Sequence, residues 1–417
     1  MSLLSHSRPL ALPKAALAML PVCCLVLSTA EASDTYFLPA ASVGPEYNSN
    51  RNMSPDASTA KSVEGYTAIA EAIFGVRTPR SSSELRPRIR YQAFPSYREY
   101  NRTEGSLDLK SEFRSERSEF TVFGKYSRQD AFTADFVNVG FDPFDPNPPP
   151  TADSGNIKVA ETRTRAELRP SFVYRWNATT GVGADFQVQD MRYSAAVPLD
   201  KRDFDNWQGN LNFLHRVSPQ TELSVGGYVG RFETKDGLDK TDSVGALLDL
   251  SHNWSRENSS ALALVVERNK AEFLGPVPSE ATTTDWGLQF STLRRGQVSR
   301  LRFAIGRQLT PSGSGGRASR DEIRAQYDRN LSQRLVFASA LRAFQQRALS
   351  EKNANSSSNR DVATVELSLN WAVTPTWFLS GGYAYNWQDV VSTSGSASNN
   401  RVFATFGYRA LDPTRRK

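Results

Sequence analysis

Apolar and polar residues alternate with a period of two over most of this chain. Residues 83–93 place Leu85, Ile89 and Tyr91 on one face and mainly charged residues on the other. The same period recurs in four later segments: 244–254, 363–371, 379–387 and 402–408. A period of two is typical of β-strands with one apolar face and one polar face. The pattern therefore predicts an all-β protein.

The connections between these segments come in two alternating lengths. Short connections carry turn residues, as at 177–181, 218–220 and 374–376. Longer polar stretches lie between them, at 50–62, 97–104, 131–157, 194–203, 234–242, 274–282, 310–319, 348–359 and 391–400. Counting the segments gives roughly 18 antiparallel strands, with about 16 as the alternative. Short turns on one side and long loops on the other predict a transmembrane up-and-down β-barrel with both termini on the short-turn side.

The alternation alone is compatible with two kinds of surroundings. In a bilayer every backbone polar group must be paired, so strands occur only in a closed barrel whose apolar face points outward. A large soluble β structure, the alternative, would point the apolar face inward. Trp176, Trp254 and Trp371 lie on the apolar face beside short turns, and indole rings prefer the headgroup region of a membrane. The tryptophans favour the membrane barrel.

The first 32 residues have the three parts of an export signal. Arg8 and Lys14 form a positive region, residues 15–29 are apolar, and residues 30–32 (Ala-Glu-Ala) offer a cleavage site. A membrane anchor is the alternative. We therefore expect a signal peptide over 1–32 and a barrel over 33–417. Both cysteines lie within this signal, so the mature chain would contain no disulfide.

The composition agrees with a barrel that has a wet interior. Only 39% of the residues are hydrophobic and the mean hydropathy is −0.48, yet 11% are aromatic. Strands with one face toward water and one toward lipid produce both values. Outside the N-terminus no apolar run approaches the roughly 20 residues of a membrane helix, which excludes a helical membrane bundle.

The formal net charge of +6 becomes informative through its arrangement. Two sets of arginines fall on the polar faces of predicted strands: Arg86, Arg88 and Arg90, and Arg163, Arg165 and Arg169. Rows of arginine along a lumen bias a pore toward anions. Alternatively, these charges pair with neighbouring strands and only solvate the lumen. A barrel of roughly 18 strands is wide enough for an aqueous channel.

The longest connection, residues 131–157, includes Phe141, Asp142, Phe144 and Asp145 in two Phe-Asp-Pro repeats. The prolines stiffen this loop and the phenylalanines are apolar anchors. It is the third long loop, the position at which general porins fold a constriction loop inward. We therefore expect a constriction loop here, with a surface loop as the alternative. Two carboxylates without an organised loop predict no metal site.

The sequence carries no recognisable catalytic set. His215 and His252 are the only histidines after the expected signal, and both lie near predicted short turns among apolar residues. No nucleophile-elbow, zinc-protease or phosphate-loop string occurs. We therefore expect no catalytic residues, no cofactor and no nucleic-acid partner, and we expect that the protein is not an enzyme.

Three short strings carry a family resemblance. They are residues 43–50 (VGPEYNSN), residues 77–81 (RTPRS) leading into 84–88 (ELRPR), and residues 116–120 (ERSEF). The mature chain resembles Gram-negative outer-membrane β-barrel proteins, and more narrowly the barrels associated with exopolysaccharide and exosortase (PEP-CTERM) gene clusters. The resemblance implies contact with outer-membrane lipid, insertion by the barrel assembly machinery, and a role in moving or housing polysaccharide.

Two functions are open at this point. One is a porin-like channel for polar or anionic solutes, serving exopolysaccharide export if the resemblance holds. The other is a non-conducting structural or glycan-binding surface barrel.

Overall fold

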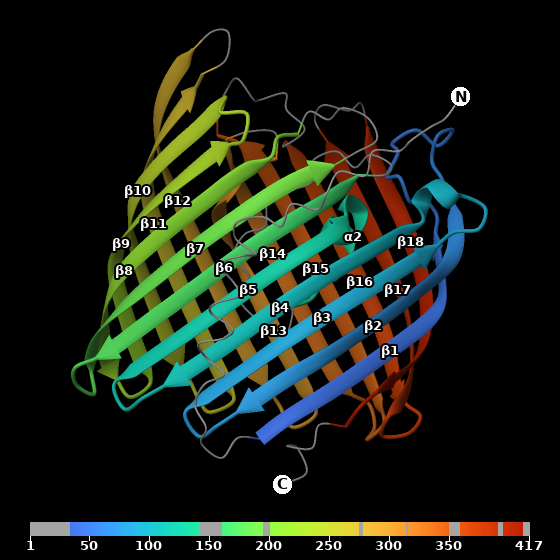
Figure 1. Cartoon of the computed structure of the whole chain (residues 1–417), viewed down its shortest axis with the longest axis horizontal. Coiled ribbons are helices and arrows are strands. Elements are labelled where there is room, and N and C mark those ends of the chain that lie inside the picture. Colours follow the sequence, from blue (N-terminus) through green and yellow to red (C-terminus); the bar gives the residue numbers. More distant parts are fainter. Residues whose placement is uncertain are drawn as a thin grey trace, which may run out of the picture.

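Eighteen antiparallel strands of 13 to 17 residues form one closed sheet (Figure 1). Each strand pairs with its neighbours in the sequence, and β1 pairs with β18 to close the ring. The computed structural model describes residues 34–137, 139–141, 161–194, 201–274, 278–313, 316–349, 359–390 and 395–411. The fold confirms the predicted all-β up-and-down barrel and corrects the alternative of 16 strands. The expected signal peptide, residues 1–32, lies outside the described residues.

The two helical segments, η1 (Arg98–Tyr100) and α2 (Ala131–Phe136), follow β3 and β5. The strands are β1 (Asp34–Asn48), β2 (Val63–Arg77), β3 (Ser81–Ala93), β4 (Arg102–Arg114), β5 (Ser118–Asp130), β6 (Thr162–Arg175), β7 (Thr180–Ser194), β8 (Phe204–Ser218), β9 (Thr221–Thr234), β10 (Asp239–Asn253), β11 (Asn258–Phe273), β12 (Ser279–Arg295), β13 (Ser299–Pro311), β14 (Arg317–Asn330), β15 (Leu335–Ala348), β16 (Arg360–Ala372), β17 (Trp377–Val390) and β18 (Ser396–Arg409). Among the described residues, no helix is long and apolar enough to cross a membrane.

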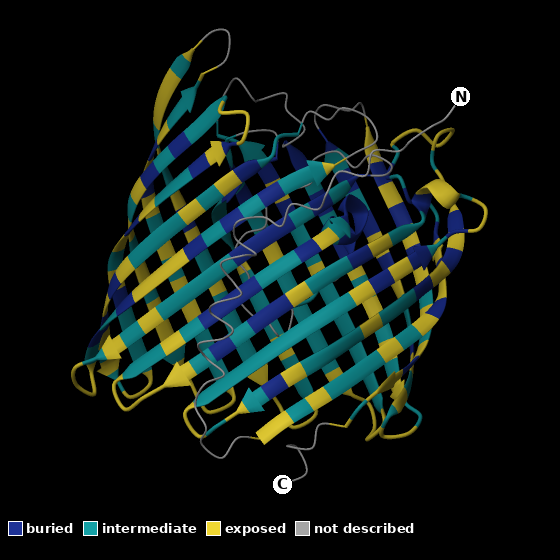
Figure 2. Cartoon of the chain, in the orientation of Figure 1, coloured by how far each residue is buried: buried dark blue, intermediate teal, exposed yellow. Residues whose placement is uncertain are grey.

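The outer surface of the barrel is apolar over its middle. Val244, Leu248 and Leu250 of β10 are 56%, 40% and 38% exposed, and every strand contributes residues of this kind (Figure 2). Soluble proteins rarely expose apolar patches of more than a few hundred Å². Trp176 and Trp254 lie beside short turns and are 44% and 67% exposed. The outer face is thus built to contact lipid, with indole rings at one boundary.

A charged substitution is expected to destabilise the barrel far more on the outer face of β10 than on its lumenal face. Leu248→Arg is expected to destabilise the barrel by about 2–4 kcal/mol, because it places a guanidinium in the lipid-facing band. Leu247→Arg, one residue earlier, projects into the lumen and is expected to cost much less. Urea titration of the barrel in lipid vesicles would measure both. Equal costs would contradict the assignment of the two faces.

Several strands extend beyond their predicted ends. Residues 234–242 and 274–282 were expected to be loops, but β10 begins at Asp239 and β12 at Ser279. Charged residues near these strand ends pair across the sheet on its outer face, as in Arg231 with Asp242 at 2.6 Å and Lys270 with Glu280 at 3.2 Å. Cross-strand ion pairs make polar residues compatible with a strand. The polarity of these residues indicated loops because the sequence does not show which charged residues will be paired across neighbouring strands.

Two prolines interrupt the ladder in the middle of the wall. Pro87 of β3 pairs with β4, but the β2–β3 register has a gap between Arg88 and Leu85. Pro170 of β6 pairs with β5 and leaves the same kind of gap toward β7. Each proline lacks the N–H that the second neighbour would need. The irregularity at each proline therefore affects one side of its strand only.

Candidate functional site: the barrel lumen

The chain turns into the lumen after β5, and α2 lies inside the ring of strands (Figure 1). Six-residue helices are unstable alone, so tertiary contacts must hold this one. Arg51, from the β1–β2 loop, is fully buried, donates a 2.7 Å hydrogen bond to Asp130 and covers the Phe132 ring at 4.0 Å. Phe132 and Phe136 pack in one cluster with Phe344 of β15. The sequence predicted a loop here, and no local helix signal marks this stretch.

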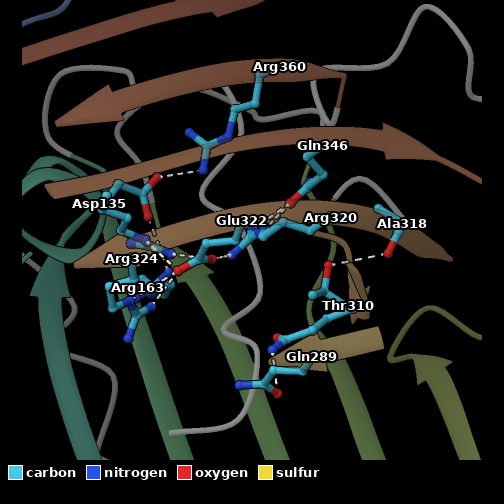
Figure 3. A network of polar contacts seen from close by, with 12 residues as sticks. Asp135, Arg163, Gln289, Thr310, Ala318, Arg320, Glu322, Arg324, Gln346 and Arg360 are labelled. Carbon is cyan, nitrogen blue, oxygen red and sulfur yellow. Dashed lines mark hydrogen bonds and ion pairs between the residues drawn. The ribbon is translucent and has the colours of Figure 1, made fainter. Parts of the chain in front are cut away.

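Asp135 of α2 joins opposite walls of the barrel. Its carboxylate lies 2.9 Å from a guanidinium nitrogen of Arg360 on β16 and 3.6 Å from one of Arg163 on β6 (Figure 3). These strands are eight steps apart by the shorter way round the ring. All three side chains are at least nine-tenths buried. The ion pairs therefore fix α2 across the lumen and not merely against one strand.

After α2 the chain continues along the lumen toward the short-turn end of the barrel. The backbone N–H of Phe141 donates a 2.8 Å hydrogen bond to Gln326 of β14, and the Phe141 ring lies 5.5 Å from the Arg324 guanidinium. Gln326 is nine residues from the long-loop end of β14, about 30 Å along the strand. We call residues 131–137 and 139–141 the lumenal segment. Asp142, Phe144 and Asp145, the other expected constriction residues, lie outside the described residues.

The six arginines of the two predicted sets all face the lumen, and each has a carboxylate partner. The pairs are Arg86–Asp108 (2.9 Å), Arg88–Glu71 (3.8 Å), Arg90–Glu104 (4.0 Å), Arg163–Asp135 (3.6 Å), Arg165–Glu167 and Arg169–Glu167 (3.1 Å). An arginine that is paired in this way contributes little net potential to a pore. The sequence had left anion bias and charge pairing open, and the geometry of these six favours pairing.

A second group of lumenal arginines lies on β14 and β15. The alternation places Glu322, Arg324 and Asp328 on one polar face, but Arg320 and Arg342 were not singled out from the sequence. Glu322 of β14 is surrounded by Arg320, Arg324 and Arg342, with nitrogen–oxygen distances of 3.9, 2.6 and 3.2 Å (Figure 3). The same period of two that identified the first sets would have found this group. What sequence could not show is that one carboxylate serves three guanidiniums.

The lumen has a packed side and an open side. On β7, β10 and β11, Asp185, Ser251 and Ala261 point inward and are nevertheless exposed. Inward residues near the lumenal segment, such as Gln346 and Arg360, are fully buried. Solvent therefore reaches the short-turn half of the interior on β7, β10 and β11, whereas inward residues nearer the long-loop end of this wall, such as Gln187, Ser243 and Glu267, are buried.

Unpaired charges of both signs point inward near the short-turn end of the barrel, on β7, β10 and β13. Arg300 and Arg302 on β13 form no ion pair with any described residue. Asp185 and Asp249 also form none among the described residues, although the Asn212 amide donates to Asp185 at 3.4 Å. These four side chains, which we call the pore-facing charges, contribute to the field that a passing ion would meet.

The two histidines lie outside the lumen. His215 and His252 share the outward face with apolar neighbours at the short-turn end. The His252 ring packs edge-on against Trp254 at 4.3 Å, and its Nδ1 is 2.8 Å from the Thr221 hydroxyl. The described part of the chain also contains no group of three metal-binding side chains. Both histidines thus occupy the membrane boundary.

The Asp135 ion pairs predict how firmly the lumenal segment is held. Asp135→Ala removes the carboxylate that Arg163 and Arg360 share. Losing one partner of a buried ion pair costs about 3–5 kcal/mol, so local opening of the segment is expected to become far more frequent. Hydrogen exchange of residues 131–137 would report it. Asp56→Ala, in an exposed loop, is the control and is expected to leave that exchange unchanged.

The same ion pairs predict an acid transition. Burial alone would raise the pKa of Asp135, but Arg360 and Arg163 lower it from the ordinary 3.8 to about 2. A depressed pKa stabilises the folded form fully above the ordinary value, and this stabilisation is lost as pH falls from 3.8 toward 2. Protection of residues 131–137 is therefore expected to stay constant from about pH 7 to 5 and to fall below about pH 4. Loss already near pH 6 would contradict this.

A closed antiparallel barrel with an apolar outer band and a charged lumen defines a transmembrane β-barrel of the outer-membrane type. No protein-family model and no curated protein sequence matches the chain. Among solved structures, it is similar to outer-membrane protein OpdK of Pseudomonas aeruginosa (9% identity, covering 90% of this chain and 99% of that one, TM-score 0.41). It is also similar to OprD of the same organism (10% identity, covering 91% of this chain and 96% of that one, TM-score 0.43). OccAB3 of Acinetobacter baumannii has 11% identity, with 91% of this chain and 100% of that one covered and a TM-score of 0.42. The function below rests on this chain's own residues.

Proposed function

We propose that this protein is a channel for small polar solutes in the outer membrane of a Gram-negative cell. The observation that supports it most directly is the solvent-exposed, inward-facing surface on β7, β10 and β11. In a structural barrel with a packed lumen, residues such as Asp185 and Ser251 would be covered. Export through a signal over residues 1–32 and insertion by the barrel assembly machinery belong to the same proposal.

The lumenal segment supports small solutes over polymers. It crosses from β6 to β16 and contacts β14 below, so it leaves only part of the cross-section for transport. Extended polysaccharide would have to pass this obstruction along its whole length. We therefore propose small solutes and do not extend the proposal to the exopolysaccharide export implied by the family resemblance.

The pore-facing charges support a mild selectivity. Two unpaired arginines and two unpaired aspartates balance in number, whereas the six arginines of the predicted sets share five carboxylates, with Glu167 serving both Arg165 and Arg169. Mixed charges along a narrow aqueous path favour polar and zwitterionic solutes and discriminate weakly between small ions. Of the two possibilities that the sequence left open, anion bias and charge pairing, our proposal therefore retains only a modest anion preference.

Planar-bilayer recording tests the proposal. The purified full-length protein is expected to give stable single-channel currents in potassium chloride. A barrel that inserts, shown by protease protection in the same membranes, yet never conducts would overturn the channel and favour the non-conducting surface barrel.

A further inference from the structure

A cavity of about 340 Å³ lies at the long-loop end of the β10–β12 wall. Its lining combines inward residues of these strands with Arg202 and with Gly316 and Arg317, where β14 begins. No residue of the lumenal segment lines it. The cavity is therefore separate from the constriction and lies where a solute from outside would arrive first.

Arg317 gives the cavity a fixed wall. Its guanidinium reaches from β14 across to β10 and β11, donating to Glu267 at 2.7 Å and to the Ser243 hydroxyl at 2.8 Å. The Glu267 side chain is 2% exposed, and the Asn269 side-chain oxygen lies 3.1 Å from the same guanidinium nitrogen. A buried ion pair with several hydrogen bonds holds its geometry well, so the cavity is formed before any ligand arrives.

The charges around the cavity cancel. Arg202 pairs with Asp239, and Arg317 pairs with Glu267. Lys240 pairs with Asp242 at 3.3 Å and with Glu272 at 3.9 Å. Every charged lining residue therefore has an opposite partner. An ionic ligand would have to displace one of these partners, whereas a neutral ligand would not.

The remaining lining suits a molecule with both hydroxyl groups and an apolar face. The Thr241 and Ser279 hydroxyls have no hydrogen-bond partner among the described residues, and the Thr283 hydroxyl donates to Asp285 at 2.7 Å, which leaves its lone pairs available. Phe273, Ala271 and Ala281 supply apolar surface beside them. Ligand sites of roughly 300–1,000 Å³ commonly combine apolar walls with a few fixed polar groups.

We propose that this cavity binds a neutral sugar of monosaccharide to disaccharide size. Ring hydroxyls would meet Thr241 and Ser279, and the apolar ring face would lie against Phe273. The site would capture the sugar at the extracellular rim, and binding there does not require that the barrel conduct.

Calorimetric titration of the full-length protein in detergent tests this with two probes of the same ring shape. D-glucose is expected to bind in the millimolar range and the anion D-glucuronate more weakly. Thr241→Val is expected to weaken glucose about tenfold, the effect of one lost hydrogen bond. Ala271→Phe fills the cavity and is expected to abolish binding. Ala263→Phe, also inward on β11 but outside the cavity lining, is the matched control and should leave binding unchanged.

Three results would overturn the assignment: no glucose binding to the unsubstituted protein, tighter binding of glucuronate than of glucose, or glucose binding that survives Ala271→Phe. Conductance measured on the same preparations separates this inference from the channel. If the barrel binds glucose but never conducts, the sugar site is supported and the channel is contradicted. If it conducts but does not bind glucose, the channel is supported and the sugar site is contradicted.

Discussion

Replacing residues 131–161 by a two-residue Asn-Gly turn is expected to raise single-channel conductance about threefold or more, because an unobstructed barrel of this strand number encloses a wide aqueous channel. The replacement removes α2, the Asp135 ion pairs and the contact of Phe141 with Gln326. These contacts hold the lumenal segment across the lumen from β6 to β16 and down to β14. The current path is then limited by the strands alone.

The barrel itself should survive this replacement. Asp130 and Thr162 are direct partners in the β5–β6 register, so a short turn can join the two strands. Heat-modifiable migration in gel electrophoresis would confirm a folded barrel. Asp135→Asn is the milder companion variant and is expected to give brief additional openings instead of a uniformly larger current. Unchanged conductance after the replacement would show that the segment does not restrict the path.

Substituting the pore-facing charges is expected to move ion selectivity in opposite directions. Arg300→Gln with Arg302→Gln removes the two unpaired guanidiniums and leaves Asp185 and Asp249, so cation preference should rise. Asp185→Asn with Asp249→Asn should raise anion preference instead. The reversal potential across a potassium chloride gradient would shift with opposite sign in the two double variants.

The control for this experiment lies on the same strand. Arg307 of β13 faces outward, where it pairs with Asp321 at 2.7 Å and stacks over Trp286. Arg307→Gln changes the net charge by the same amount per residue but does not face the pore, so the reversal potential is expected to stay where it is. A shift with Arg307→Gln as large as with the inward arginines would mean that total charge, and not the pore-facing charges, sets selectivity.

Much of the barrel was predictable because alternation is a local property. The side chains of a strand point to opposite faces, so Arg86, Arg88 and Arg90 had to share one face and Leu85 and Ile89 the other. The same rule would have located Arg300 and Arg302. Strand ends were less predictable, since the charged ends of β10 and β12 become strand only through cross-strand pairing.

The lumenal site depended on contacts between residues far apart in the chain. Arg163, Asp135 and Arg360 meet because the sheet closes into a ring, and no spacing in the sequence encodes that meeting. The sequence left a constriction loop and a surface loop open for residues 131–157. The helix α2 has no side-chain cap, and its helical form follows from packing. The anion bias inferred from the arginines weakened once their partners Asp108, Glu104 and Glu167 were located.

The sequence by itself determined the two faces of each strand and the presence of charge in the lumen, because backbone periodicity dictates these, and it limited the strand number to roughly 18 or 16. Tertiary structure decided which charges are neutralised, which side of the lumen stays open, and where a cavity forms at the rim. Those outcomes depend on distances across a closed barrel. A residue's partner on the opposite wall is set by closure and register, and its neighbours in sequence carry no record of it.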